Sequence, residues 1–262
     1  MTSQTSSTVI DAEAAGTVPR LSLNRWTFRT TPVQEFLEAT TSRGIEAVGL
    51  WRQDVEEVGL DALRRRVDDA GLRVSSLCRG GFLTASAEAD RADKDIVGAR
   101  ARVTEAIAEL APYAEERGVR LSLEPMHPMF AADRAVLSTI DQALDIAEAS
   151  GSSAVGVVVD TYHVWWDPYL ERAIQRAAAS DRLLAYQVCD WNLPLAAEPL
   201  HSRGYMGDGF VDFPAITRMI AEAGYTGDIE VEIFNEDVWA TPAEESARII
   251  AERYQELVLP YA

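Results

Sequence analysis

Short apolar runs and longer amphipathic segments alternate along this chain from residue 20 to its end. The apolar runs predict buried strands, and the segments with apolar positions at helical spacing predict helices. Thr31 and Pro32 stand at cap and first-turn positions, and Gly44, Gly71 and Gly118 follow predicted helices. The predicted strands are 21–26, 47–51, 73–78, 119–124, 155–160, 183–190 and 229–233, and the predicted helices are 31–44, 61–70, 96–117, 139–149, 168–179, 214–223 and 242–257.

A strand followed by a helix, repeated with short connections, predicts a parallel sheet and the α/β class. A (β/α)8 TIM barrel is the natural closed form. The pattern supplies seven strands, however, because residues 82–96 hold only a polar stretch, and a helix-plus-strand unit needs roughly 30 residues. Either the barrel lacks one βα unit between residues 82 and 96, or a segment is absent from this chain. We predict a disordered N-terminal tail at 1–19 and a TIM-barrel catalytic domain at 20–262.

Composition excludes several classes of partner. The net charge of −18 disfavours nucleic acid and anionic membranes, which bind basic surfaces. No run of 18 apolar residues occurs, and the Ser-, Thr- and Ala-rich start has no secretory pattern. Cys78 and Cys189 lie in predicted strands and are expected to be buried, reduced thiols. The chain is therefore predicted to be a cytoplasmic protein with no nucleic-acid and no membrane partner.

Potential metal-binding and proton-transferring groups stand at the ends of the predicted strands. Each of the three histidines, His127, His163 and His201, lies beside carboxylates at such a position. In an α/β barrel the strand ends on one rim are where catalytic side chains converge. Taken singly, each of these residues also fits a cap, a salt bridge or a polar core group.

Four oxygen donors occupy the same relative position in four strands and are the candidate metal ligands. They are Glu124, Asp160, Gln187 and Glu232. A repeat of this kind in four units is hard to obtain by accident, so we predict that the four side chains meet around one divalent ion. Oxygen-rich sites suit Mn²⁺, Mg²⁺ or Ca²⁺ better than zinc or copper.

Tryptophans gather near the same predicted rim. Five of the six are at strand ends or just after them, where they could form an aromatic wall for sugar C–H faces or flat rings. Packing of loops onto the top of the barrel is the simpler explanation for any one of them. The five candidates for substrate binding are Trp26, Trp51, Trp165, Trp166 and Trp191.

Residues 21–257 resemble the xylose isomerase-like TIM barrel superfamily, which contains sugar and sugar-phosphate isomerases and epimerases. The resemblance rests on Leu-Glu-Pro at 123–125, Asp-Thr-Tyr-His at 160–163, Gln-Val-Cys-Asp at 187–190, Arg-Gly-Tyr-Met-Gly-Asp-Gly-Phe-Val-Asp at 203–212 and Gly-Asp-Ile-Glu-Val-Glu at 227–232. It implies a divalent metal, with Mn²⁺ first and Mg²⁺ or Co²⁺ as alternatives. The implied ligands are Glu124, Asp160, position 187 and Glu232, although this chain has Gln187 where the usual ligand is His. Some 3-dehydroshikimate dehydratase-like members look similar there.

The resemblance also implies a mechanism. A bound cation would polarise a substrate carbonyl and stabilise an enediolate, while Glu124 and Glu232 would remove and return the proton. His163 and His127 would hold a substrate oxygen, act as a base, or orient a ligand carboxylate. In the long loop after Asp190, His201 and Arg203 would bind the substrate.

The leading functional hypothesis is a divalent-metal-dependent sugar isomerase or epimerase acting on a small polyhydroxy carbonyl compound. The first alternative is a lyase of the same superfamily, either a dehydratase of a keto acid or inosose or an enzyme that cleaves C-glycosides of 3-keto sugars. The second is a non-catalytic barrel that serves as a sensor or subunit. A homodimer or hetero-oligomer is expected. The three histidines and the charge of −18 argue strongly against an abasic-site endonuclease.

Overall fold

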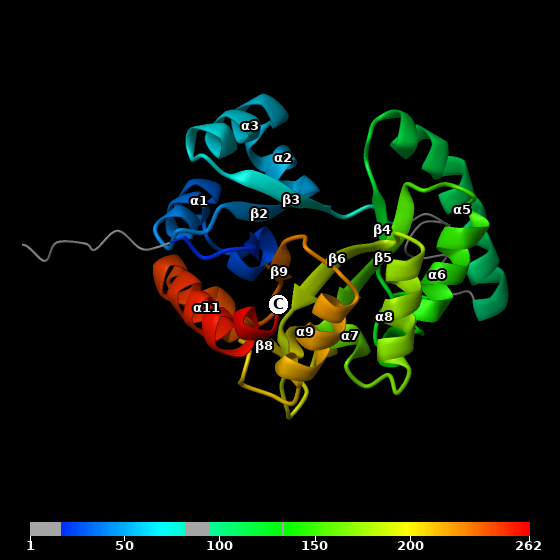
Figure 1. Cartoon of the computed structure of the whole chain (residues 1–262). Coiled ribbons are helices and arrows are strands. Elements are labelled where there is room, and N and C mark those ends of the chain that lie inside the picture. The colour runs from blue at the N-terminus through cyan, green and yellow to red at the C-terminus, as the bar shows by residue number, and fades with distance from the viewer. Residues whose placement is uncertain (1–16, 82–94, 133) are drawn as a thin grey trace, which may run out of the picture.

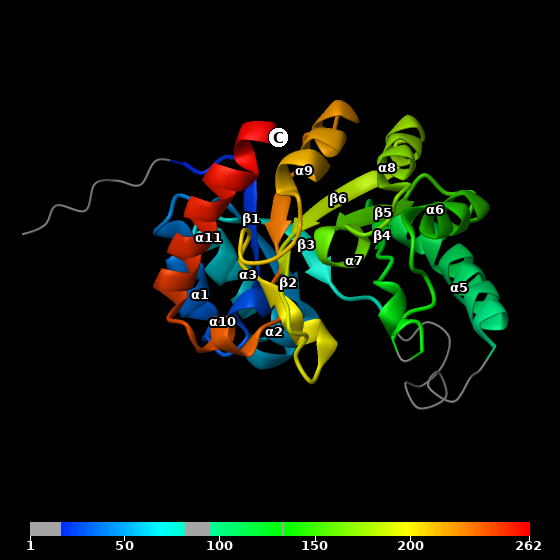
Figure 2. The same ribbon diagram turned by 90° about the horizontal axis from the view of Figure 1, so that it is seen from below.

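The computed structural model describes residues 17–81, 95–132 and 134–262. Seven parallel strands form one sheet in the order β3-β2-β1-β9-β6-β5-β4, and the sheet curls with helices on its outside (Figures 1 and 2). This confirms the predicted α/β barrel architecture. The strands are β1 Leu21–Asn24, β2 Ala47–Trp51, β3 Arg73–Cys78, β4 Leu121–Leu123, β5 Val155–Asp160, β6 Leu183–Val188 and β9 Ile229–Val231.

The helices that follow the strands agree with the predicted ones to within a few residues, and three short helices were not predicted. The long helices are α1 Val33–Thr41, α3 Leu60–Asp69, α5 Ile96–Glu116, α6 Ile140–Ala149, α8 Leu170–Ala179, α9 Phe213–Glu222 and α11 Ala243–Leu257. The unpredicted ones are α2 Arg52–Val58, α7 Thr161–Val164 and α10 Glu236–Ala240. Each unpredicted helix begins within five residues after a strand, where it covers the carboxyl end of the sheet.

Four predicted strands end earlier than expected, by one residue in β4 and by two residues in β1, β6 and β9. The first stops at Asn24, whose side chain accepts a hydrogen bond from the backbone N–H of Trp26 and so begins the 3-10 helix η1, Arg25–Phe28. The sixth stops at Val188, and the chain then forms the short antiparallel pair β7 (Asp190–Trp191) and β8 (Arg203–Gly204). Val18, at the end of the predicted tail at 1–19, is buried in the core, while residues 1–16 lie outside the described part of the chain.

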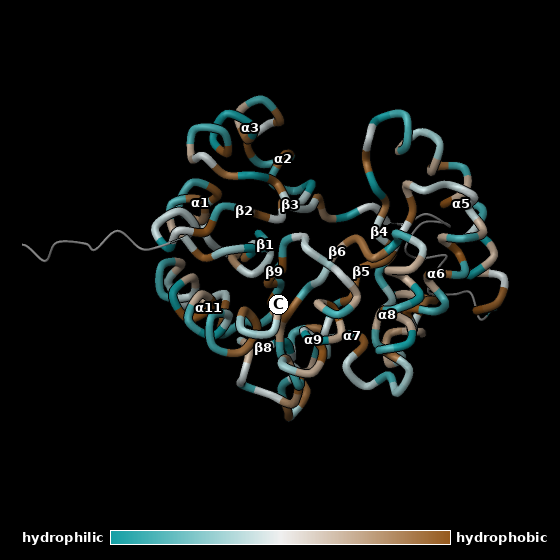
Figure 3. The backbone as a smooth tube through the Cα atoms, viewed as in Figure 1, coloured by the Kyte–Doolittle hydropathy of each residue, from teal (hydrophilic) through white to brown (hydrophobic). Residues whose placement is uncertain are grey.

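Within the described part of the chain, the sheet has two edges, β3 and β4, and its pairs do not form a closed ring. Among the described residues, no strand pairs with the outer edge of either one. Val74 and Leu77 of β3 are 44% and 75% exposed as a result. By contrast, β5, which pairs with β4 on one side and β6 on the other, is buried throughout, and Figure 3 shows hydrophobic residues concentrated along β5 and β6. Residues 82–94, on which the predicted gap falls, lie outside the described part of the chain.

A buried carboxylate ties four strands together inside the barrel. Side chains alternate along β9, so that Glu230 shares a side of the strand with Glu232 while Ile229 and Val231 face the helices. Glu230 is 4% exposed. It accepts hydrogen bonds from Asn24 (2.8 Å), Gln187 (2.9 Å), Ser75 (3.0 Å) and Ser76 (2.6 Å). These donors belong to β1, β6 and β3.

The buried carboxylate of Glu230 leaves no room for a side chain at Gly49 of β2. A Cβ added there would lie 2.5 Å from Oε2 of Glu230 and 2.7 Å from Oγ of Ser76. Gly49→Ala is expected to lower the free energy of unfolding by about 1–3 kcal/mol, the usual cost of overpacking a core. Gly81→Ala is the matched control, because nothing lies within 4 Å of a Cβ at that position. Urea unfolding of the two variants checks this, and equal stability would contradict the steric account.

Candidate active site

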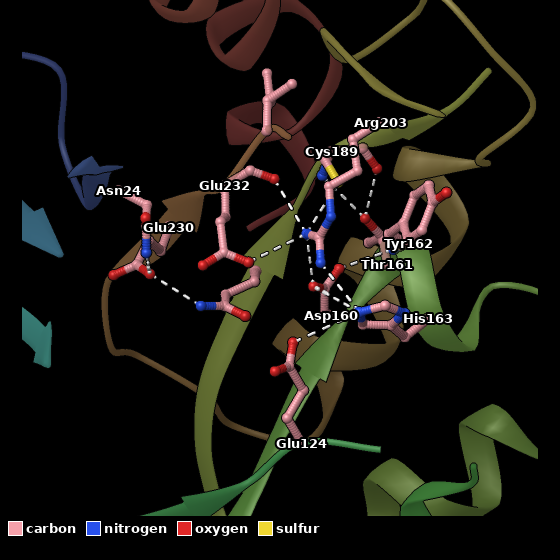
Figure 4. A network of polar contacts seen from close by, with 12 residues as sticks. Asn24, Glu124, Asp160, Thr161, Tyr162, His163, Cys189, Arg203, Glu230 and Glu232 are labelled. Carbon is pink, nitrogen blue, oxygen red and sulfur yellow. Dashed lines mark hydrogen bonds and ion pairs between the residues drawn. The ribbon is translucent and has the colours of Figure 1, made fainter. Parts of the chain in front are cut away.

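The carboxyl ends of β4, β5 and β9 bring three acids to one place. Glu124 follows β4, Asp160 ends β5 and Glu232 follows β9. The guanidinium group of Arg203 lies between the last two: its Nη1 is 2.8 Å from Oδ2 of Asp160 and 3.3 Å from Oε2 of Glu232 (Figure 4). Asp160 and Arg203 are 1% and 2% exposed. The predicted convergence of acids is therefore present, with an arginine at its centre that the sequence placed only in a loop.

His163 joins this cluster through its Nε2 atom, which is 3.8 Å from Glu124 and 3.9 Å from Asp160. Nη2 of Arg203 lies 3.0 Å from the same Nε2, and the backbone N–H of His127 lies 3.2 Å from Nδ1. A neutral imidazole accepts at one nitrogen only. The charge-assisted contact with Arg203 is the shorter and stronger one, so we assign the lone pair to Nε2, where it accepts from Arg203.

Gln187 lies next to this cluster but is turned toward Glu230. Its Nε2 donates to Oε1 of Glu230 at 2.9 Å, and the side chain is 7% exposed. This bond orients the amide so that its carbonyl oxygen accepts no hydrogen bond from the described part of the chain. A carbonyl oxygen with free lone pairs is a competent ligand for a hard cation. The role of Gln187 as a metal ligand thus stays a prediction.

Burial sets the ionisation of the cluster. Removal from water raises the pKa of Glu124, and repulsion from Asp160 adds to this. Water screens part of the effect, since 37% of the Glu124 side chain is accessible. Burial also raises the pKa of Glu232 well above its ordinary value, against the attraction of Arg203. Burial lowers the pKa of His163 to about 3, so its imidazole is neutral at pH 7.

Among the described residues, two groups of side chains have the spacing to hold a metal ion. In the first, the ligand atoms of Glu124, Asp160 and His163 lie within 4.8 Å of one another. Two carboxylates and a neutral imidazole are a donor set that binds divalent transition ions, so the residues fit such an ion. The second group is Cys78, Glu230 and Glu232. It is a poorer candidate, because burial raises the pKa of the Cys78 thiol and Glu230 already accepts four hydrogen bonds.

The predicted tryptophans form two aromatic groups. Trp26 and Trp51 stack with ring centroids 4.4 Å apart, and Phe234 lies 5.9 Å from Trp51. On the other side, Trp191 lies 4.7 Å from both His127 and Tyr162, with Trp165 5.7 Å from Trp191 and Trp166 5.8 Å from His127. The guanidinium of Arg203 lies 4.8 Å from the ring of Tyr162 and 4.9 Å from that of Phe234, between the two groups.

His201 does not join the acid cluster. It lies in the 3-10 helix η3, Pro199–Ser202. Its ring packs edge-to-face with Trp239 at a centroid distance of 4.9 Å, and its Nδ1 is 3.7 Å from Oε1 of Glu236. The backbone nitrogen of His127 lies 3.2 Å from Nδ1 of His163, while the ring of His127 packs among the tryptophans. Its role as a catalytic base is therefore less well supported than that of His163.

The loop that carries Arg203 is held by Asp190, which the sequence indicated only as the end of a strand. Its Oδ1 accepts the backbone N–H groups of Trp191 (2.8 Å) and Val211 (3.0 Å), and its Oδ2 accepts those of Gly207 and Gly209 (both 2.8 Å). The side chain is completely buried. A charged acceptor for four N–H groups fixes the path of residues 203–212.

Asp190→Asn is expected to lower the free energy of unfolding by about 2–4 kcal/mol, because the amide NH₂ group leaves two buried N–H groups without an acceptor. Asp212→Asn is a matched control in the same loop. Asp212 caps α9 by accepting from Ala215 N–H, and asparagine caps equally well. Urea unfolding with limited proteolysis of the 203–212 loop checks both variants; a stable, protease-resistant D190N protein would contradict this role.

In α/β barrels, active sites lie at the carboxyl ends of the strands. The acid cluster of this chain lies at that end, which places the protein in the class of α/β-barrel enzymes. The family model for the xylose isomerase-like TIM barrel matches residues 82–254. The chain therefore belongs to this family. Among the described residues, none of the helices has the length and apolar character needed to cross a membrane.

Solved structures extend the similarity to nearly the whole chain. The crystal structure of protein SMc04130 from Sinorhizobium meliloti 1021 is 38% identical and has a TM-score of 0.86, over 92% of this chain and 99% of that one. The structure of the IolI protein with a bound zinc atom has a TM-score of 0.75 at 18% identity, over 92% of this chain and 99% of that one. The second likeness shows the fold alone.

Curated relatives are more distant. An inosose isomerase from Bacillus velezensis is 27% identical over 159 residues, which are 60% of this chain and 55% of the relative. A 3-dehydroshikimate dehydratase from Pseudomonas aeruginosa is 26% identical over 162 residues, which are 58% of this chain and 24% of the relative. The match thus spans about half the length of the inosose isomerase and a quarter of the dehydratase.

Proposed function

We propose that this chain is a divalent-cation-dependent enzyme that moves a proton on the carbon next to a carbonyl group of a small polyhydroxy compound. The leading form of the proposal is a sugar isomerase or epimerase. The observation that carries it is the meeting of Glu124, Asp160 and His163, with Glu232 joined to Asp160 through Arg203. The similarity to an inosose isomerase supports this class of reaction.

A divalent cation held by Glu124, Asp160 and His163, with Glu232 and Gln187 as further candidate ligands, would supply Lewis-acid polarisation of the carbonyl group. Mn²⁺ is our first candidate, because most of these donors are oxygen atoms. The chain's own groups would carry the proton. Glu124 is the accessible carboxylate and would remove it, since a raised pKa brings a carboxylate closer to the strength of base that proton abstraction at neutral pH requires. Glu232 would return it from the other side of Arg203.

Neutral His163 would offer the lone pair of its Nε2 to the cation, and its buried position excludes water from that side. The aromatic groups around Trp26–Trp51 and Trp191 would pack against the C–H faces of a ring-shaped or sugar substrate. We therefore assign substrate contact to Trp26, Trp51, Trp165, Trp166 and Trp191. A cytoplasmic location and a homodimer or hetero-oligomer stay predictions.

A lyase is the second candidate, because Gln187 replaces the histidine usual at that position and a 3-dehydroshikimate dehydratase is among the relatives. Both reactions begin with the same proton abstraction. In a lyase, the electron pair released at carbon would expel a leaving group instead of recovering the proton.

Proton exchange in D₂O, followed by NMR, tests the proposal on a panel of ketoses, inososes, 3-dehydroshikimate and 3-keto glycosides with added Mn²⁺. Deuterium at the α carbon together with an isomeric product supports the isomerase. Loss of water or of an aglycone supports the lyase. No exchange with any compound, by a folded protein that binds Mn²⁺, would contradict both.

A further inference from the structure

Arg203 fills the centre of the acid cluster with its own positive charge. Its Nη1 donates to Asp160 at 2.8 Å and to the backbone carbonyl of Glu232 at 3.1 Å, and its Nη2 lies 3.0 Å from Nε2 of His163. The attraction of the neighbouring acids, Asp160 foremost, outweighs burial and keeps the pKa of Arg203 above its ordinary value, so that the group is always charged.

The side chain is held by charge more than by a complete set of hydrogen bonds. Its Nε is buried and finds no acceptor among the described residues. Its aliphatic stem leaves β8, whose backbone is fixed separately by pairing with β7 and by the bond from Asn235 Nδ2 to the Arg203 carbonyl oxygen (2.8 Å). The guanidinium can thus leave the cluster without disturbing the backbone that carries it.

The atoms that hold the guanidinium are the atoms that a cation needs. Oδ2 of Asp160 and Nε2 of His163 contact Arg203, and the same two groups, with Glu124, form the set that has metal-binding spacing. Nε2 of His163 has one lone pair, so it cannot ligate a metal ion while it accepts an N–H. Oδ2 of Asp160 has a second lone pair, but a cation bound there would lie beside the positive guanidinium. Two positive groups also repel each other strongly in a buried site.

We propose that Arg203 and a divalent cation compete for the same donor atoms, so that Arg203 neutralises the acid cluster when no cation is bound and must leave Asp160 when one binds. This inference rests on the proposed function. It makes Arg203 a residue that limits the affinity for the cation and prevents the acids from repelling one another in the cation-free protein. It adds to the predicted role of Arg203 in substrate binding, since the displaced guanidinium remains beside the reacting groups.

Calorimetric titration with Mn²⁺ tests the competition without any assay of activity. Arg203→Met keeps the approximate length and removes the charge, and it is expected to bind Mn²⁺ at least about tenfold more tightly than wild type, which corresponds to about 1.4 kcal/mol. Arg218→Met is the control, because it removes one exposed charge that stacks on Tyr261 and is expected to leave the affinity unchanged. In a folded Arg203→Ala protein, millimolar methylguanidinium should take the place of the missing side chain and weaken Mn²⁺ binding again.

A crystal structure of the wild-type protein with Mn²⁺ tests the same competition without a variant, and it is used if the variants fail to fold. The expected result is a metal ion contacting Asp160, with the guanidinium moved out of hydrogen-bond distance of that carboxylate. A bound metal with the Arg203–Asp160 contact intact, or equal affinities of R203M and wild type, would overturn the competition while leaving the proposed cation site in place. Absence of Mn²⁺ binding in wild type and in R203M alike would overturn both.

Discussion

Glu124→Gln is expected to lower the rate of α-proton exchange by about 10²–10⁴-fold, the range that a positioned general base contributes. Glutamine keeps the size of the side chain but cannot accept the proton. The raised pKa of Glu124 reflects its enclosure among protein atoms and the nearby charge of Asp160, conditions found where a carboxylate acts as a base. The rate is measured by deuterium incorporation on any panel compound that the wild type exchanges.

Glu198→Gln is the matched control for this variant. Glu198 pairs with Arg134 at 2.9 Å on the surface, with 42% of its side chain exposed, so its loss should leave the exchange rate unchanged. An E124Q protein that is folded and exchanges at the wild-type rate would remove Glu124 from the chemistry. Glu232→Gln distinguishes the two candidate reactions. An epimerase needs both carboxylates, one to remove the proton and one to return it, while a lyase can begin with Glu124 alone.

Asp160→Asn is expected to lower the free energy of unfolding by about 3–5 kcal/mol, as happens when one partner of a buried ion pair is removed. The carboxylate is 1% exposed, and its Oδ2 is the 2.8 Å partner of the buried Arg203. Without it the guanidinium loses its shortest ion pair and keeps the contacts with Glu232 (3.1 and 3.3 Å) and with Nε2 of His163 (3.0 Å). The NH₂ group of an asparagine at this position would face one of two hydrogen-bond donors. It would point either at the guanidinium of Arg203 or at the backbone N–H of Tyr162, which Oδ1 of Asp160 now accepts.

Asp145→Asn is the surface counterpart of this variant. Asp145 pairs with Arg176 at 2.7 Å, but 70% of its side chain is exposed, so the expected loss is about 0–1 kcal/mol. Urea unfolding at pH 7 measures both. A D160N protein as stable as D145N would show that the acid cluster is not an integral part of the fold.

The strands and most helices were predictable because glycines and prolines mark their ends and because β5 is buried on both sides, which gives a continuous apolar run. The short helix α2 was missed, since it starts directly after Trp51 and carries mostly polar residues. The strand-end acids were predictable from their repeated position alone. Their meeting point follows from the parallel arrangement of the strands.

Arg203 and Gln187 show what local sequence could not supply. The path of the 191–202 loop decides that Arg203 enters the acid cluster, and nothing in the loop's own pattern encodes that path. The burial of Glu230 was predictable from the sequence. In Glu230-Val-Glu232 the two acids alternate with apolar residues, so both must face the barrel interior. Gln187 was predicted as a ligand from its position, but its hydrogen bond with Glu230 depends on a neighbouring strand that lies 43 residues away in sequence.

Equilibrium dialysis against Mn²⁺ followed by elemental analysis tests the cation site most directly, with wild type, E124A and D160A measured side by side. The account predicts about one tightly held ion per wild-type chain, as expected for a single site with one set of ligands, and none in either folded variant. Wild-type protein that retains no ion at any Mn²⁺ or Zn²⁺ concentration up to millimolar would contradict the account.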